Sequence, residues 1–358
     1  MKKRVLLGMS GGVDSSVSAV ILQKRGYEVI GATMKLWEPS CSFEGESSCC
    51  GSEAVYDAKR VCDKLGIPHY TLNYKQDFKC KVVDKFIDDY KNAKTPNPCI
   101  ECNKYLKFKC FYEKALELEC DYIATGHYAK TIFSEKYNQV VLTKSNESKK
   151  DQTYFLYTMP KNEIEHVIFP LQDFKCKQEI RKIAEEEGLL VAHKKDSQEI
   201  CFIPDNDYHS FLKRYLDQDI KSGNIVLKNG EILGKHNGLI NYTIGQRKGL
   251  GIAYKEPLYV IGLDIQKNEV IVGCEEQLYS KELYANEINW MVNLDFENPV
   301  KCLAKIRYRA KEANAIIYKI ESDKIKVEFE ESQRAVTKGQ SVVFYDEEGV
   351  VLGGGKIL

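Results

Sequence analysis

Residues 4–16 read RVLLGMSGGVDSS, and this stretch decides the fold. Its first half is a compact apolar run, which is typical of a buried strand in a parallel sheet. The run passes directly into a loop with two adjacent glycines. Apolar residues then recur at helical spacing until a glycine ends them: Val13, Val17, Val20, Ile21 and finally Gly26. We therefore predict a strand, a glycine loop and a helix in direct succession.

The same alternation continues through the first third of the chain. Periodicity and turn residues predict further strands over 28–34, 68–72 and 121–125, and helices over 52–65, 78–90 and 101–118. Strands that alternate with helices form a parallel sheet with helices on both faces. Ligands of such sheets bind at the carboxyl ends of the strands, which is where the glycine loop follows the first strand.

The glycine loop offers the groups that an anion requires. Its glycines let the backbone approach a phosphate closely, Ser10 and Ser15 add hydroxyl donors, and the first N–H groups of the following helix are unpaired. The loop differs from the Walker loop, which ends in Gly-Lys-Ser/Thr, and from the G-x-G-x-x-G dinucleotide fingerprint. A tight turn without a ligand is the alternative, but two glycines, two serines and an aspartate exceed what a turn requires. We therefore predict a phosphate or pyrophosphate site.

Composition excludes some classes of protein. Lysine plus arginine and aspartate plus glutamate each total 52, so the net charge is zero and an RNA-binding surface requires local segregation of charge. Residues 1–7 lack the apolar core and cleavage site of a signal peptide, and no stretch is apolar enough to span a bilayer. The chain has thirteen cysteines and no export signal, so we expect these thiols to be reduced, as in the cytosol. We expect a cytoplasmic protein without a membrane partner.

Two segments gather positive charge. Residues 91–114 contain six lysines against two glutamates. Lys305, Arg307, Arg309 and Lys311 alternate along the chain, and on a strand all four would share one face, which suits a phosphate backbone. An ordinary solvated strand face is the alternative on charge alone.

The pattern changes beyond residue 205. Short helical and strand segments up to Gly273 indicate a small α+β connector. Regular short strands follow over 300–309, 313–320, 325–330, 341–345 and 350–356, and they predict a small β-barrel. We therefore divide the chain into a catalytic domain over 1–204, a connector over 205–275 and a barrel over 276–358.

The loop Ser10–Ser15 resembles the pyrophosphate loop of the ATP-pyrophosphatase families, which cleave ATP between the α and β phosphates to adenylate a substrate. Later segments resemble one member of this superfamily, the tRNA-uridine 2-sulfurtransferases, and occur in the same order. They are 95–103 with Lys107-Phe108, 124–128, 150–156, 196–203 and 244–251. The likeness covers essentially the whole chain and implies an N-terminal α/β domain of the adenine nucleotide α-hydrolase type.

The resemblance also implies the reaction, which is ATP-dependent 2-thiolation of the wobble uridine of tRNA with AMP and pyrophosphate as products. A carbonyl oxygen is a poor leaving group, so adenylation activates it before a persulfide sulfur attacks carbon 2. By the match, Cys102 is the nucleophile, Cys201 carries the persulfide, and the two form a transient disulfide. They are 99 residues apart, so spacing alone does not pair them. Most of the other cysteines are expected to be small buried hydrophobes.

Ligand contacts follow from the same match. The nucleotide is ATP, expected with Mg²⁺, and the implied residues are Gly8, Met9, Ser10, Gly11, Gly12, Val13, Asp14, Ser15, Met34 beside the adenine and Gly126. The implied tRNA contacts are His127, Lys150, Asp151, Gln152, Tyr308, Arg309 and Gln340, which would make the barrel a tRNA-binding domain. The expected partners are tRNAs that accept lysine, glutamate or glutamine, and a cysteine desulfurase that acts directly or through a sulfur-relay protein.

Cys99 departs from the family pattern, because some members have an aspartate there with an acid–base role that a thiol does not reproduce at its ordinary pKa. The pair Cys99 and Cys102 is also half of a zinc site, which Cys49 and Cys50 would complete. A sharper alternative is a [4Fe–4S] cluster on Cys99, Cys102 and Cys201. The metal-free persulfide route stands beside both. Cys41, Cys49 and Cys50 otherwise belong to a polar surface loop.

Two other classes of function compete. An amidotransferase-like ligase would use the same loop on a metabolite, but it requires neither a thiol pair nor an RNA-binding barrel. A non-catalytic RNA-binding protein with a decayed nucleotide site is the other class, and intact Asp14 and Ser15 disfavour it.

Overall fold

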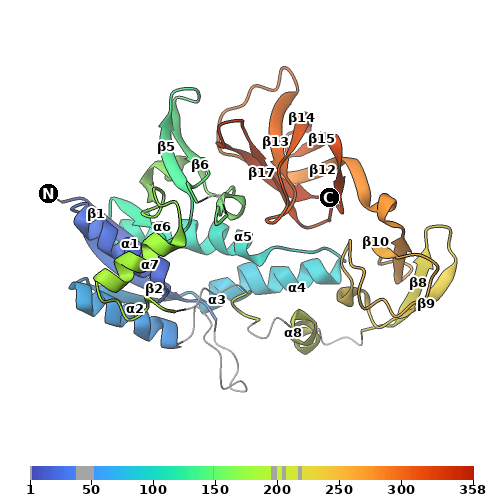
Figure 1. Cartoon of the computed structure of the whole chain (residues 1–358), viewed down its shortest axis with the longest axis horizontal. Helices are drawn as coiled ribbons and strands as arrows, with labels where there is room; N and C mark the ends of the chain where they lie inside the picture. Colours follow the sequence, from blue (N-terminus) through green and yellow to red (C-terminus); the bar gives the residue numbers. More distant parts are fainter. Residues whose placement is uncertain (1, 38–51, 148, 195–199, 204–206, 217–219) are drawn as a thin grey trace.

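The computed structural model describes residues 2–37, 52–147, 149–194, 200–203, 207–216 and 220–358. Figure 1 shows a helix-covered sheet at the N-terminal end, a small sheet with one nearby helix, and a barrel that contains the C-terminus. No helix within the described ranges is long and apolar enough to cross a membrane. The α/β domain, small middle domain and C-terminal barrel expected from the sequence are confirmed.

The N-terminal sheet is five-stranded and parallel throughout, in the order β3-β2-β1-β4-β7. Its core strand β1 is buried along its middle, in keeping with an apolar run that is covered on both faces. The strands are β1 (Arg4–Gly8), β2 (Glu28–Lys35), β3 (His69–Asn73), β4 (Tyr122–Ala124) and β7 (Val167–Ile168). The packed helices include α1 (Val13–Lys24), α2 (Ser52–Leu65) and α7 (Lys177–Glu186).

The strand order reverses at β1. The chain adds β2 and β3 on one side of β1 and then places β4 on the other side. Open α/β sheets bind their ligands at such a switch point, beside the carboxyl ends of the strands. The predicted phosphate loop follows β1 and so lies at this switch point.

Two long helical runs follow β3, and both contain a π-helical stretch. The first comprises α3 (Lys75–Phe78), η1 (Lys79–Val83) and α4 (Asp84–Lys91), and the second comprises α5 (Pro98–Cys102), η2 (Asn103–Cys110) and α6 (Phe111–Glu117). Helix α5 starts cleanly because the Asn97 side chain accepts the Cys99 N–H at 3.2 Å and Pro98 occupies the first turn. The predicted helices are therefore present, and π-helical stretches of this kind often accompany functional sites.

A hairpin that the sequence analysis did not anticipate fastens the barrel to the N-terminal domain. Strands β5 (Lys130–Ser134) and β6 (Gln139–Thr143) project from that domain beside the barrel (Figure 1). Val141 of the hairpin is buried in the barrel core, and the Thr143 hydroxyl donates to the Gly349 carbonyl at 3.0 Å. The two domains therefore share both apolar and polar contacts. Short helices η3 (Thr153–Phe155) and η4 (Lys161–His166) complete this region.

In its described residues, the middle domain contains the α-helix α8, short 3-10 helices and a four-stranded sheet in the order β10-β11-β8-β9. Its elements are α8 (Tyr208–Tyr215), β8 (Gly223–Leu227), β9 (Ile232–His236), η5 (Leu239–Asn241), β10 (Tyr259–Asp264), β11 (Glu269–Gly273) and η6 (Glu275–Leu278). Strands β8 and β11 pair in parallel, whereas the outer pairs are antiparallel.

Six strands close the C-terminal barrel in the order β12-β15-β14-β13-β16-β17. They are β12 (Tyr279–Trp290), β13 (Val300–Lys305), β14 (Ala313–Glu321), β15 (Lys324–Arg334), β16 (Ser341–Tyr345) and β17 (Val351–Ile357). The sequence analysis missed β12, although it identified the other five. Only Leu283 and Ala285 of its twelve residues are buried, which leaves β12 with a weak apolar periodicity.

The expected row of four basic side chains on one strand is wrong. Strand β13 ends at Lys305, and the next residues turn. The Arg307 guanidinium points inward and donates to the Ala335 carbonyl, and its burial lowers the pKa of the group. One of the four cations is therefore hydrogen-bonded to a backbone carbonyl of the barrel and is only half-exposed.

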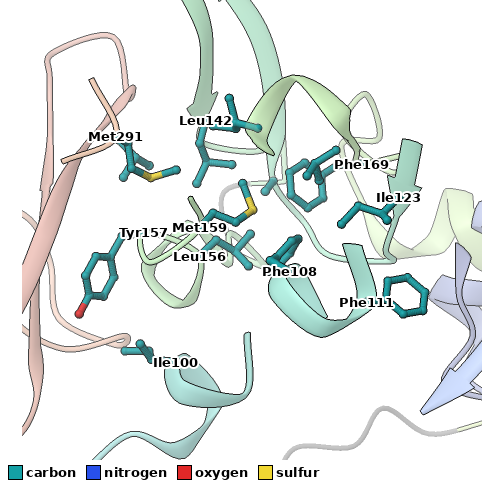
Figure 2. Packing of buried hydrophobic residues seen from close by; sticks show 14 of the residues in the cluster. Ile100, Phe108, Phe111, Ile123, Leu142, Leu156, Tyr157, Met159, Phe169 and Met291 are labelled. Carbon is teal, nitrogen blue, oxygen red and sulfur yellow. The ribbon is translucent and has the colours of Figure 1, made fainter. Parts of the chain in front are cut away.

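A single apolar cluster joins the sheet, the second helical run and the barrel (Figure 2). It combines Ile123 of β4 with Phe108 and Phe111 of the helical run, and Leu142 of the hairpin with Met291 beyond β12. Its residues are almost fully buried, and burial of each large apolar side chain stabilises the fold by about 1.5–3 kcal/mol. The barrel is therefore packed against the catalytic core rather than tethered to it.

Closure of the barrel depends on Gly353. Its φ is +152°, and a Cβ atom there would lie 2.4 Å from the Asn289 carbonyl oxygen of β12. We expect Gly353→Ala to lower the free energy of unfolding by about 3 kcal/mol, because it combines backbone strain with a main-chain clash. Gly26→Ala is the matched control, since Gly26 has φ +86° but nothing within 4 Å, and it should cost roughly 1 kcal/mol. Equal destabilisation of both variants in urea unfolding would contradict the clash.

Candidate active site

The loop between β1 and α1 is held open by its own serines. The Ser10 N–H donates to the Ser15 hydroxyl oxygen at 3.2 Å, and that hydroxyl donates to the Gly12 carbonyl at 3.1 Å. Gly11 has φ +69°, and a Cβ atom there would lie 2.4 Å from the Ala54 carbonyl oxygen, so only glycine fits. Gly12 caps α1 without a side chain, which leaves the first N–H groups of the helix available to an anion.

Asp14 brings a carboxylate into this otherwise anion-binding loop, and two side chains compensate for it. The Lys177 ammonium donates to both carboxylate oxygens, at 2.7 and 2.6 Å, and the Tyr128 hydroxyl donates to one of them at 2.8 Å. The Lys177 side chain is only 11% exposed. The sequence analysis did not identify Lys177, because it lies 163 residues from Asp14 and no motif surrounds it.

Gly126 brings the end of β4 against the phosphate loop. A Cβ atom at this position would lie 3.0 Å from the Ser15 backbone nitrogen and 3.2 Å from Cβ of Asp14. Glycine therefore allows the two loops at the switch point to touch. Met34, near the end of β2, packs against the central apolar cluster and also against the cluster that contains Cys102.

His127 follows Gly126 and has a defined protonation state. The Lys107 ammonium lies 3.4 Å from Nε2, and Nδ1 lies 2.8 Å from the Thr125 hydroxyl oxygen. An ammonium only donates, so Nε2 accepts and the ring proton resides on Nδ1. Burial, together with the charge of Lys107, holds the pKa of His127 well below its ordinary value. The imidazole is therefore neutral at physiological pH.

Cys102 and Cys201 belong to one aromatic cluster, which we term the thiol cluster. Its buried members include Cys102 with Phe78, Phe86, Leu106, Phe202 and Phe211, and Cys201 packs against it. Phe202 anchors its neighbour Cys201, because its ring lies 5.4 Å from that of Phe86 and 5.6 Å from that of Phe78. Both residues thus lie in one apolar cluster, although the sequence separates them by 99 residues.

Cys99 is exposed at the start of α5, whereas Cys102 is buried one turn later. The described residues, which include Cys99, Cys102 and Cys201, contain no group of three His, Cys, Asp or Glu side chains placed to hold a metal ion. These three thiols therefore do not form the donor set of a cluster in this conformation. Cys41, Cys49 and Cys50, and with them the other half of the zinc hypothesis, lie outside the described residues.

Three other thiols have the properties of ordinary core residues. Burial raises the pKa of Cys62 and of Cys302 to about 12, and that of Cys120 to about 11. Thiolates are the reactive form, so these three groups are chemically inert near neutral pH. Cys62 and Cys120 are buried as expected, but the expectation that most cysteines are buried hydrophobes is wrong for the described residues. Cys80 is exposed, and Cys110, Cys176, Cys274 and Cys302 are only half-buried.

Segment 150–152 lies beside Tyr308, although the two are far apart in the sequence. The Tyr308 ring is 4.3 Å from that of Phe155, and the Lys305 ammonium lies 5.7 Å over it. Asp151 is buried, and its carboxylate accepts from the Ser145 N–H and the Thr153 hydroxyl. Its charge therefore faces inward, where it does not oppose a phosphate.

The remaining residues implied to contact tRNA occupy two places. Arg309 is exposed at the turn that follows β13. Gln340 lies elsewhere, because its amide donates to the Thr95 carbonyl at 2.7 Å, just before α5. Gln340 thus connects the barrel to the segment that leads into Cys99 and Cys102.

A phosphate-sized loop at the switch point of a parallel sheet, joined to a β-barrel, defines an α/β nucleotide-binding protein with an added barrel domain. Family models match most of the chain: "tRNA methyl transferase HUP domain" over residues 3–205, "tRNA methyl transferase PRC-barrel domain" over 209–274 and "Aminomethyltransferase beta-barrel domain" over 280–357. The chain belongs to the MnmA family of tRNA-specific 2-thiouridylases.

Curated relatives carry this family assignment. The chain is 50% identical over 357 residues to the tRNA-specific 2-thiouridylase MnmA of Clostridioides difficile, which covers 100% of this chain and 98% of that protein. It is also 50% identical over 359 residues to the protein of the same name from Acetivibrio thermocellus, with 99% of each chain covered. The similarity therefore extends through all three parts of the structure.

We expect the neutral state of His127 to depend on Lys107. Lys107→Met removes the nearby charge, so the pKa of His127 should rise toward its ordinary value while burial keeps it below. NMR titration of labelled histidine measures this shift, and Lys109→Met, an exposed lysine of the same helical run, is the control. An unchanged His127 titration in Lys107→Met would contradict the contact.

The sign of the associated pH effect is fixed. The unfolded chain protonates a histidine near pH 6.5, whereas the folded chain keeps His127 neutral. The contribution of His127 to stability is therefore complete above about pH 6.5 and is lost as the pH falls below that value.

Proposed function

We propose that the chain catalyses ATP-dependent 2-thiolation of the wobble uridine of tRNA. The uridine O2 attacks the α phosphorus of ATP, the bond between the α and β phosphates breaks, and pyrophosphate leaves as the base loses its N3 proton. The sulfane sulfur carried on Cys201 then forms a bond to carbon 2, and the bond from carbon 2 to the adenylated oxygen breaks to release AMP.

Electrons balance through the second thiol. Sulfane sulfur gains two electrons when it becomes the thiocarbonyl sulfur of the product. Cys102 supplies them by attacking the Cys201 sulfur, which cleaves the persulfide S–S bond and closes a Cys102–Cys201 disulfide. A small dithiol or a dithiol protein reduces this disulfide before the next turnover, and a persulfide donor such as a cysteine desulfurase reloads Cys201.

The observation that carries this proposal is the presence of Cys102 and Cys201 in one cluster that also contacts Met34. A thiol pair near the end of β2 lies on the side of the sheet from which the phosphate loop emerges. Methyl transfer, which the family-model descriptions name, requires neither ATP cleavage nor a thiol pair. A metabolite ligase likewise leaves the paired thiols without a role.

ATP is the cofactor of the proposal, and its phosphates would contact the loop from Gly8 to Ser15. Mg²⁺ usually binds through phosphate oxygens, water and one or two carboxylates. The carboxylate in the loop, Asp14, already accepts from Lys177 and Tyr128, so most of the ligands of a metal ion would come from the phosphates. Because Cys99, Cys102 and Cys201 are not gathered as a donor set, no step of the proposed reaction uses an iron–sulfur cluster.

The division of labour within the chain is part of the proposal. Residues 1–204 adenylate and thiolate the base, 205–275 connect, and 276–358 bind tRNA. The tRNA contacts are His127, Lys150, Gln152, Tyr308, Arg309 and Gln340, with Asp151 acting through its neighbours. Gln340 supports this arrangement, because it joins the barrel to the segment before the nucleophile helix.

Thiolation should require both thiols of the thiol cluster. Cys102→Ser and Cys201→Ser should each lower the yield of thiolated tRNA at least about a hundredfold, because a hydroxyl carries no persulfide and closes no disulfide. Retardation of thiolated transcript in a mercury gel, with ATP and a persulfide donor present, measures this yield.

Cys274→Ser in the middle domain is the control for these variants and should retain full yield. The proposal fails if wild-type protein forms no AMP when it is given tRNA transcript. It also fails if Cys102→Ser thiolates normally.

Lys177 should be a phosphate contact as well as the partner of Asp14. A charged hydrogen bond of this kind contributes about 1.5–3 kcal/mol, so Lys177→Met should raise the KM for ATP by about ten- to a hundredfold. The KM for tRNA should change little. Lys182→Met, a 76% exposed lysine on the same helix, is the control. An unchanged KM for ATP in Lys177→Met would exclude the phosphate contact.

A further inference from the structure

Tyr128 connects two sites that the proposed function keeps separate. Its hydroxyl donates to Asp14 of the phosphate loop at 2.8 Å. Its backbone N–H donates to the Gln152 side-chain oxygen, and the Gln152 N–H donates to the Tyr128 carbonyl, both at 2.9 Å. One residue thus holds the nucleotide loop with its side chain and segment 150–152 with its main chain.

The surroundings of Tyr128 make this connection stiff. The side chain is 3% exposed and packs in the apolar cluster that includes Val13 and Val17 of α1. The Lys177 ammonium lies 5.8 Å from the centre of its ring. A side chain held on all sides in this way moves with its backbone, because packed interiors have few alternative rotamers.

The far end of the connection is stiff for a different reason. Gln152 precedes the short helix η3, and the buried Asp151 carboxylate accepts from Thr153 of that helix and from Ser145. Phe155 at the end of η3 packs against Tyr308, with 4.3 Å between the two ring centroids. A displacement of the Tyr128 backbone is therefore passed to the segment and to the barrel residue beside it.

Phosphate binding changes the charge balance at the near end. The Lys177 ammonium donates to both carboxylate oxygens of Asp14, at 2.6 and 2.7 Å. When a triphosphate shares that ammonium, the Asp14 carboxylate depends more on the Tyr128 hydroxyl, and charge-assisted hydrogen bonds of this kind shorten and strengthen. The loop, Tyr128 and Gln152 are then held in one arrangement.

We propose that Tyr128 is a positioning residue that couples ATP binding to tRNA binding, so that each ligand raises the affinity for the other. This inference rests on the proposed function, since it concerns the same two ligands. It assigns no chemical step to Tyr128. Coupling of this kind is reciprocal, because the factor by which ATP tightens tRNA equals the factor by which tRNA tightens ATP.

The test measures both factors in the full-length protein. The probes are the α,β-methylene analogue of ATP, which resists cleavage, and an unmodified tRNA transcript. Wild-type protein should show a coupling factor of about 5 to 150, the usual range for linked sites. In Tyr128→Phe, which keeps the packed ring and removes the hydroxyl, both factors should fall to within about twofold of one.

Tyr74→Phe is the matched control. The Tyr74 hydroxyl donates to the Cys110 carbonyl at 3.1 Å in the same domain and joins neither site to the other. This variant also loses one tyrosine hydrogen bond, and it should keep the wild-type coupling factor. An equal loss of coupling in both variants would mean a general structural effect and would overturn the proposal.

A measurement on the wild-type protein keeps the proposal falsifiable if Tyr128→Phe does not fold. Saturating nucleotide analogue without tRNA should slow amide exchange at Gln152, whose N–H donates to Tyr128. Unchanged exchange, or a wild-type coupling factor of one, would overturn the coupling. If the wild-type protein thiolates tRNA but Tyr128→Phe keeps the normal coupling factor, only this inference is refuted. If the wild-type protein makes no thiolated tRNA, the proposed function is refuted.

Discussion

The parallel pairing of β1 with β4 is the constraint on which the rest of the structure depends. It places Leu7 beside Ala124, so the two strands end together and release their loops at the same edge of the sheet. The loop after β1 becomes the phosphate loop, and the loop after β4 brings Gly126 within contact of it. Any side chain at Gly126 would separate the two loops. The site therefore requires both the pairing of β1 with β4 and a glycine at position 126.

The molecule has a polar environment around the phosphate loop and an apolar one around the thiols. The phosphate loop is polar, and its one carboxylate is compensated by the Lys177 ammonium and the Tyr128 hydroxyl. The two thiols lie instead among aromatic rings, where Cys102 is buried. The charged groups and the thiols thus occupy distinct surroundings. Such a division suits a reaction that first moves phosphates and then moves sulfur, because burial protects a thiol that open solvent would oxidise.

Local patterns allowed much of the fold to be predicted. Helix α2 was located to the residue, and β1, β2, β3 and β4 to within a residue or two, because apolar periodicity and glycines mark them directly. The fifth strand of the sheet, β7, was not predicted. The hairpin β5–β6 and strand β12 were not predicted. Their positions depend on distant partners, because Val141 of the hairpin packs in the barrel core and β12 pairs with β15 and β17. The sequence predicts Arg307 as a surface cation, but its guanidinium donates to the Ala335 carbonyl of the barrel.

The site followed the same division. The phosphate loop is contiguous, so its residue types alone indicate an anion site. Only the resemblance pairs Cys102 with Cys201, although both lie in the thiol cluster. Nothing in the sequence around Lys177 predicts a role for it, because its partner Asp14 lies 163 residues away in the chain. Spacing within a motif is visible in one sequence, but a contact between two elements is visible only after folding.

The neutral net charge limits how such a chain can select a polyanion. A protein without a large positive field gains little from nonspecific attraction to RNA, because that attraction comes from the release of counterions by many cations. Selection then falls to a few placed contacts. In the proposed function, Tyr308, Arg309 and segment 150–152 form one such set, and Gln340 contacts the segment that precedes helix α5. With Arg307 turned inward, the barrel relies on the positions of its groups more than on their charge. The proposed reaction at a single base is better served by such placement than by strong attraction to every phosphate.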